Sequence, residues 1–204
     1  MAKKVENAEK YTQFLIDNIL YPGQGVWTTQ PNRGDYHSGM FTWTRNTRQD
    51  DTMMCYVADY IQNYQILKFK ARADYTDMTG LTGKWFGYML RFRDASVSFN
   101  NQECYIVIVK PDQGKIELQR YGTSAKNLYK EYYTDQIKYG EDYEVEYGAI
   151  DTEDGSVRII FRVNGETIID YMDSEDPVRD AGYFGVFQTK GNLNNTLVLM
   201  GVNQ

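Results

Sequence analysis

Tryptophan and arginine recur at alternate positions of two strand-like segments in this chain. The first segment carries Trp43 and Arg45, and the second carries Trp85, Arg91 and Arg93. Alternate side chains of a β-strand point to the same face of the sheet. An indole ring offers a flat apolar surface on which a sugar ring can stack, and a guanidinium group donates paired hydrogen bonds to hydroxyl or carboxylate oxygens. These side chains are therefore candidate contacts for a carbohydrate.

Three further polar side chains are candidates for the same surface. Gln188 ends a strand-like run near the C-terminus, whereas Tyr36 and His37 belong to a long glycine-bearing loop, residues 21–38. Long loops of compact domains often carry function. For the tryptophans and arginines the alternative is a structural role, in which the indoles fill corners of the core and the guanidinium groups are ordinary solvent-exposed strand residues. As a group, the residues favour a binding face.

The segments that must position these side chains are short β-rich runs separated by turn residues. Such runs recur about every ten residues, which is typical of a β-sandwich. They span residues 39–45, 52–59, 64–75, 84–94, 103–110, 115–121, 142–151, 156–163, 167–172, 182–188 and 195–202. Asp154-Gly155 and Asn164-Gly165 are hairpin signals, so an antiparallel meander is expected there. The prediction is an all-β fold with two antiparallel sheets, a β-sandwich of the jelly-roll kind.

The organisation of the chain points to a single sandwich domain over residues 1–204. Sandwiches often use about 200 residues as one folding unit, and no repeat or linker interrupts this sequence. Residues 1–24 are expected to be an N-terminal extension. Within it Tyr11, Phe14 and Leu15 follow helical spacing, so this part forms either one short helix or an edge strand.

Two motifs in the C-terminal half resemble those of a known group of sandwiches. The sequence VNGETIIDYMD is followed after a spacer by AGYFGVF, within residues 142–187. This order resembles concanavalin A-like and laminin-G-like jelly-roll domains, and the resemblance extends over residues 26–201. It implies a carbohydrate-binding module that recognises a polysaccharide. Other members of the fold are glycoside hydrolases, polysaccharide lyases and laminin-G-like protein-adhesion modules, which remain the alternatives.

Catalytic residues of those enzymes are not recognisable here. A glucanase of family 16 would carry an E-x-D-x-x-E pattern, whereas Glu144 and Glu146 lack the central aspartate. A sandwich-type alginate lyase would carry a Gln-x-His pair, but the single histidine lies in the early loop. No G-x-S-x-G elbow is present for a nucleophilic triad. We therefore expect a noncatalytic protein and keep an enzyme on the same scaffold as the alternative.

Cofactor signals are weak, so no cofactor is expected to be required. Asp50 and Asp51 lie in one loop, and a second acidic loop spans residues 173–180. Calcium prefers several such oxygens, but neither loop has the alternating pattern of an EF-hand, so each is either a structural calcium site or a solvated turn. Cys55 and Cys104 lie in strand-like runs and not at zinc-ligand spacing. They form either one disulfide or two small buried apolar side chains.

Composition limits the partners and the location. The chain has 22 basic and 28 acidic residues and a net charge of −6, without the basic run that a nucleic-acid backbone requires. No apolar run reaches the roughly 18 residues of a membrane-spanning helix, and the start shows no signal peptide. We expect a secreted or extracellular protein that binds polysaccharide, alone or beside other modules of a larger enzyme.

Overall fold

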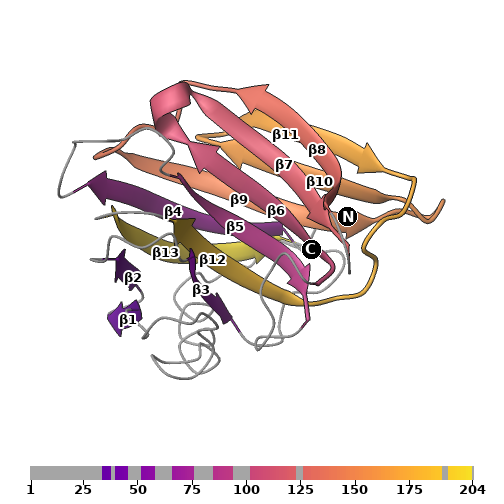
Figure 1. Ribbon diagram of the computed structural model, residues 1–204, viewed down its shortest axis with the longest axis horizontal. Helices are drawn as coiled ribbons and strands as arrows, with labels where there is room; N and C mark the ends of the chain where they lie inside the picture. The colour runs from indigo at the N-terminus through magenta and orange to yellow at the C-terminus, as the bar shows by residue number, and fades with distance from the viewer. Residues whose placement is uncertain are drawn as a thin grey trace.

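The protein is a sandwich of two antiparallel β-sheets in the computed structural model (Figure 1). The structure describes residues 34–37, 40–45, 52–57, 66–75, 85–93, 102–122, 126–189 and 193–203. Every pairing within the two sheets is antiparallel. The predicted all-β sandwich is therefore confirmed. Among the described residues no helix is long and apolar enough to cross a bilayer.

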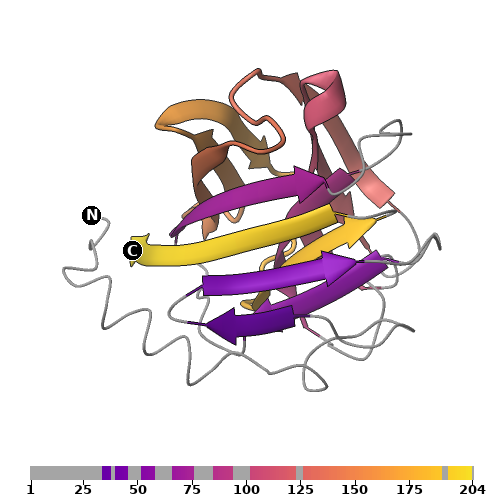
Figure 2. The same ribbon diagram turned by 90° about the vertical axis from the view of Figure 1, so that its left-hand side faces the viewer.

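The larger sheet has seven strands, and Figure 2 shows the end of it where the C-terminal strand lies between β4 and β2. Its strands in spatial order are β1 (Gly34–His37), β2 (Met40–Arg45), β13 (Leu193–Asn203), β4 (Ile66–Tyr75), β9 (Asp142–Asp151), β10 (Val157–Val163) and β11 (Glu166–Asp173). The smaller sheet has six strands: β3 (Thr52–Val57), β12 (Tyr183–Thr189), β5 (Trp85–Phe92), β6 (Cys104–Lys110), β7 (Lys115–Tyr121) and β8 (Lys126–Tyr133). A short 3-10 turn, η2 (Pro111–Gln113), joins β6 to β7.

The core lies between the sheets and is rich in aromatic rings. The rings of Phe69 and Tyr88 are 4.8 Å apart between centroids, and Phe184 packs against both. The hydroxyls of Tyr88 and Tyr143 share a hydrogen bond of 2.9 Å across the sheets. Each of these two buried hydroxyls thus has a hydrogen-bond partner, although the core around them is apolar. The alternate apolar residues of β10 also belong to the core: Val157, Ile159, Phe161 and Val163.

The predicted meander of β9, β10 and β11 is also confirmed. Asn164 and Gly165 both have positive φ, 51° and 84°, as the two-residue turn that matches strand twist requires. The Asn164 side chain also accepts a hydrogen bond of 2.9 Å from the Glu144 backbone N–H. The sequence signal and the local backbone therefore agree at this hairpin.

Two strands were not predicted. Residues 34–37, assigned from sequence to a loop, form β1, in which Tyr36 pairs with Phe41 and His37 with Met40. The loop prediction was wrong there because four residues suffice for an edge strand that pairs locally with β2. Strand β8 was missed altogether. The expected N-terminal helix or strand lies outside the described residues.

The two cysteines are too far apart to form a disulfide. Cys55 lies in β3 and Cys104 in β6, and two further strands separate them in the sheet. Neighbouring strands are about 4.8 Å apart, so roughly 14 Å separates the two positions. A disulfide needs Cα atoms within about 7 Å of each other. Cys104 is instead a buried thiol, and its burial raises its pKa.

Candidate functional site

The outer face of the seven-stranded sheet carries paired charges where its side chains are described. Arg162 binds Glu146 at 2.6 Å, Arg158 binds Asp170 at 2.6 Å, and Lys68 forms an ion pair with Glu144. Exposed pairs of this kind contribute little to stability and are typical of a solvated surface. On strands β4, β9, β10 and β11 the outer face therefore carries neighbouring side chains of opposite charge that neutralise each other. It does not form an aromatic platform.

The outer face of β7 and β8 is different, because carboxylates, an amide and tyrosines meet there. On β7, Ile116 and Leu118 belong to the core, so the residues that alternate with them point away from it. The register pairs outward residues directly across the two strands. We call this group the outer-face cluster; it consists of the pairs Lys115 and Tyr133, Glu117 and Glu131, and Gln119 and Tyr129.

Lys115 joins the two glutamates of the cluster. Its Nζ lies 3.0 Å from Glu117 Oε1 and 2.9 Å from Glu131 Oε1. Gln119 Nε2 donates a hydrogen bond of 2.9 Å to Glu117 Oε2. The hydroxyls of Tyr129 and Tyr133 both donate to Glu131, the latter at 3.2 Å. Each aromatic ring is thus held beside a carboxylate.

Exposure divides the cluster into a buried floor and an exposed rim. Tyr133 is 70% exposed and Tyr129 is 41% exposed, whereas Glu117 and Gln119 are buried. Gln119 Oε1 is buried and has no hydrogen-bond partner. An unsatisfied buried acceptor of this kind costs about 1–3 kcal/mol, so a donor that reached it would be bound favourably. The buried floor therefore provides a hydrogen-bond acceptor, Gln119 Oε1, and the exposed rim provides the two tyrosine rings.

The charge state of the glutamates limits what the cluster can do. Burial raises the pKa of Glu117, but hydrogen bonds from Lys110 and Lys115 outweigh burial, so its pKa is lowered overall. Hydrogen bonds from Tyr129 and Lys115 lower the pKa of Glu131 to about 2. Both carboxylates are therefore ionised at neutral pH. They can accept hydrogen bonds, but neither holds the proton that a general acid must donate.

Trp85 shares the outer face of this sheet with the cluster. Phe86, Tyr88 and Leu90 of β5 belong to the core, so Trp85 points to the opposite side. It is half-buried. Across the sheet from β5, the register aligns Gly87 with Ile108, Ile108 with Glu117, and Glu117 with Glu131. The predicted tryptophan and the unpredicted cluster thus lie on the same face of one sheet, with the buried residues Gly87 and Ile108 between them.

Arg91 does not reach that surface, and the prediction that it lies on the outer strand face was wrong. Its side chain is 2% exposed, and its guanidinium donates to Asp151 Oδ1 at 2.7 Å and to the Ala149 carbonyl at 2.6 Å. The cause is a β-bulge. Strand β12 pairs Tyr183 with Phe92 and Phe184 with Leu90, so the register with β12 skips Arg91, which takes φ 62°. This extra residue breaks the alternation of faces and turns the side chain inward.

Arg93 remains exposed and forms ion pairs with Asp180 and Glu103. It therefore lies at the end of the sandwich and not along the middle of the sheet. The other predicted contacts are described in backbone only. Gln188 of β12 pairs with the core residue Phe86. Trp43 and Arg45 of β2 pair with Asn195 and Leu193, and with Tyr36 and His37 of β1 they belong to the seven-stranded sheet.

The structure therefore does not bring the two predicted tryptophans into one sheet. Trp85 lies in the six-stranded sheet and Trp43 in the seven-stranded sheet. One sheet face therefore cannot present Trp43 and Trp85 together as a binding platform. Of the predicted contacts, Trp85 alone has a described side chain on the same sheet face as the outer-face cluster.

Metal ligands are not gathered among the residues whose placement is described. No three histidine, cysteine or acidic side chains of that part lie close enough to hold an ion. In the second acidic segment, residues 173–180, Asp173 is buried and bound to Arg120 at 2.7 Å. Asp50 and Asp51 lie outside the described residues, so a structural calcium ion stays a prediction.

The sequence held one signal for the cluster. In β8, Tyr129, Glu131 and Tyr133 alternate at the strand period. The same segment also places Leu128 and Tyr132 four residues apart, which fits a helix equally well. This ambiguity concealed the strand, and with it the aromatic half of the cluster.

Comparisons with known proteins identify the fold. No protein-family model and no curated protein matches the chain. A Bacillus subtilis protein of unknown function with a galectin-like fold is 9% identical, with a TM-score of 0.65 over 100% of this chain and 98% of its own. The carbohydrate-binding module CBM66 from Bacillus subtilis is 16% identical, with a TM-score of 0.55 over 87% and 93%. A prokaryotic β-1,3-1,4-glucanase (lichenase) from a mouse hindgut metagenome is 12% identical, with a TM-score of 0.58 over 84% and 82%.

At identities this low, structural similarity shows the fold alone. The activity has to be argued from the residues of the site. Binding modules and hydrolases both occur among the similar structures. The chain has the concanavalin A-like jelly-roll fold.

Proposed function

We propose that this protein binds carbohydrate without cleaving it, through the outer-face cluster of β7 and β8. The observation that carries the proposal is the pair of exposed rings, Tyr129 and Tyr133, on either side of the ionised carboxylate of Glu131. Rings bind the apolar face of a sugar, and a carboxylate accepts hydrogen bonds from its hydroxyls. The carbohydrate-binding module among the similar structures supports the same class of ligand.

The dimensions of the cluster favour an oligosaccharide or polysaccharide. Tyr129 and Tyr133 are four residues apart on one strand, which corresponds to about 14 Å along β8. Both hydroxyls bond to Glu131, so the ring tips converge, but the bases of the rings line a stretch of strand longer than one sugar ring. Trp85 lies on the same face of the sheet but in β5, three strands away from β8. We infer that Gln119 Oε1 accepts a hydrogen bond from a hydroxyl of a sugar placed beside Tyr129.

A glycoside hydrolase is the second candidate, and a specific observation favours considering it. Glu117 and Glu131 are register partners and both contact Lys115, so two carboxylates face one space. Retaining glycosidases use two carboxyl groups about 5–5.5 Å apart, one of them protonated. Here both pKa values are lowered, so the proton is missing. The charge state, and not the spacing, favours binding over hydrolysis.

A glycan array, read with and without EDTA and followed by calorimetry on any hit, tests the proposal. We expect binding to one class of glycan, and Tyr133→Ala should weaken it roughly ten-fold, as the loss of one aromatic contact implies. Met172→Ala is the matched control because Met172 is 45% exposed on the other sheet. Unchanged affinity in a folded Tyr129→Ala, Tyr133→Ala double variant would refute the assignment. Release of reducing ends from the bound glycan, abolished by Glu117→Gln, would establish the hydrolase instead.

A further inference from the structure

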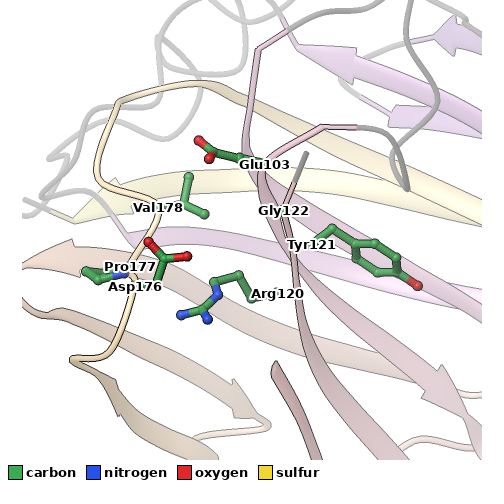
Figure 3. A pocket seen from close by; sticks show the side chains of 7 residues that line it. All are labelled: Glu103, Arg120, Tyr121, Gly122, Asp176, Pro177 and Val178. Carbon is green, nitrogen blue, oxygen red and sulfur yellow. The ribbon is translucent and has the colours of Figure 1, made fainter. Parts of the chain in front are cut away.

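A small pocket opens at the end of the sandwich, where β7 ends (Figure 3). Its volume is about 20 Å³. A cavity of this size holds about one water molecule, and so about one hydroxyl group. The pocket is lined by Glu103, Arg120, Tyr121, Gly122, Asp176, Pro177 and Val178. In Figure 3 the Arg120 side chain extends toward the loop that carries Asp176 and Pro177, whereas Tyr121 points away.

Arg120, which lines the pocket, has a buried hydrogen-bond donor that is not used. The residue is 5% exposed, and its Nη1 donates to both carboxylate oxygens of Asp173 at 2.7 Å. Its Nε–H is buried and has no partner. A guanidinium donor without a partner is costly, because the group was removed from water without replacement of its hydrogen bonds. An acceptor oxygen in the pocket would remove that cost.

The wall opposite Arg120 is held in place by buried hydrogen bonds. The Val178 N–H donates to the Tyr105 hydroxyl at 3.0 Å, and the Val178 carbonyl accepts from Arg91 Nη1 at 2.7 Å. Tyr105 in turn donates to Asp173 Oδ2 at 2.8 Å. The two walls are thus tied to the same buried aspartate. A site formed in this way loses little conformational freedom when a ligand enters.

The charges around the pocket select the ligand. The positive charge of Arg120 is already balanced by Asp173, and Glu103 and Asp176 add two carboxylates at the lining. Asp176 makes no ion pair in the described part of the chain, whereas Glu103 is shared with Arg93 at 3.7 Å. An anion such as phosphate would be repelled there. A hydroxyl group fits, because it can accept from Arg120 Nε and donate to a carboxylate at the same time.

We propose that this end pocket binds one hydroxyl group of a neutral sugar, with Arg120 Nε as donor and Asp176 or Glu103 as acceptor. The inference rests on the proposed carbohydrate-binding function and adds a second point of contact to it. The pocket begins at Arg120, directly after the last β7 residue of the outer-face cluster, Gln119. Because adjacent side chains of a strand point to opposite faces, Arg120 lies on the inner side of the sheet, so a sugar unit reaches the pocket from the end of the sandwich and not along the outer face.

The test observes the donor itself by nuclear magnetic resonance. In the full-length, nitrogen-15-labelled protein, the Arg120 Nε–Hε signal is identified by its loss in Arg120→Lys, which keeps a cation beside Asp173. Glucose, galactose, mannose, fructose and inorganic phosphate are added separately. We expect one of the sugars to shift this signal and phosphate to leave it unchanged. Asp176→Asn should weaken the sugar that shifts it roughly ten-fold, as loss of a charged hydrogen bond implies.

Asp112→Asn is the matched control, because Asp112 is an exposed aspartate in the turn at the opposite end of β7. It should leave the affinity unchanged. If sugars shift the ring signals of Tyr129 and Tyr133 but not the Arg120 signal, the pocket proposal fails and the proposed function stands. A shift of the Arg120 signal by phosphate alone also overturns the pocket proposal. If no sugar shifts either set of signals, the pocket proposal and its carbohydrate ligand are overturned together.

Discussion

Glu131 shows how single contacts set the chemistry of the outer-face cluster. Hydrogen bonds from Tyr129 and Lys115 lower the pKa of this glutamate to about 2, compared with about 4.3 in an unfolded chain. A lowered pKa means that the ion pair stabilises the fold fully above about pH 4.3 and that this contribution is lost as the pH falls toward about 2. Carbohydrate binding that depends on ionised Glu131 should therefore persist at mildly acidic pH.

Lys115→Met should raise the titration midpoint of Glu131, because one of its two strongest contacts is removed. The midpoint of Glu117 should rise with it, since Lys115 contacts both carboxylates. Carbon-13 resonances of the side-chain carboxyls, followed against pH, measure both midpoints. Lys70→Met, an exposed lysine of the seven-stranded sheet, is the control and should change neither. Equal Glu131 midpoints in wild type and Lys115→Met would show that the lysine does not set its charge.

The bulge in β5 turns Arg91, which was expected on the surface, into a buried side chain that binds Asp151 and the Ala149 carbonyl. Arg91→Met should destabilise the protein by about 3 kcal/mol, because it leaves buried carbonyls and Asp151 without their donor. Urea unfolding measures the change. Arg158→Met is the matched control: Arg158 is also a strand arginine in an ion pair, but its side chain is 45% exposed, so a loss of at most about 1 kcal/mol is expected. Similar losses in the two variants would contradict the internal role of Arg91.

Strands β10, β5 and β8 show what the sequence could and could not predict. The turn Asn164-Gly165 identified the hairpin that follows β10, because this signal is local. The bulge at Arg91 depends on how β12, about ninety residues later, pairs with β5, and nothing local specifies it. Strand β8 was missed because its apolar residues fit two periods. Sequence therefore predicted the sandwich, but neither the cluster nor the pocket, and Trp85 as a sugar contact stays a prediction.

At the scale of the whole molecule, one buried network joins the two sheets and the loop that follows β11. Asp173 at the end of β11 binds Arg120 of β7 and Tyr105 of β6, and Tyr105 also accepts from the Val178 N–H. Three segments that are distant in sequence thus share one carboxylate. Burial of this group without these donors would be strongly unfavourable, so the sheets and the loop are expected to be ordered together.

Tyr105→Phe tests that coupling, since it removes one hydroxyl and little volume. Asp173 loses a donor and the Val178 N–H loses its acceptor, so a loss of about 1–3 kcal/mol in the free energy of unfolding is expected. Hydrogen exchange should accelerate most at the Val178 amide, because its only described hydrogen-bond acceptor has gone. Tyr129→Phe, which removes an exposed hydroxyl from the outer-face cluster, should leave Val178 exchange unchanged. If Tyr105→Phe accelerates exchange uniformly and not at Val178 first, the hydroxyl stabilises the whole core and does not hold the pocket wall in particular.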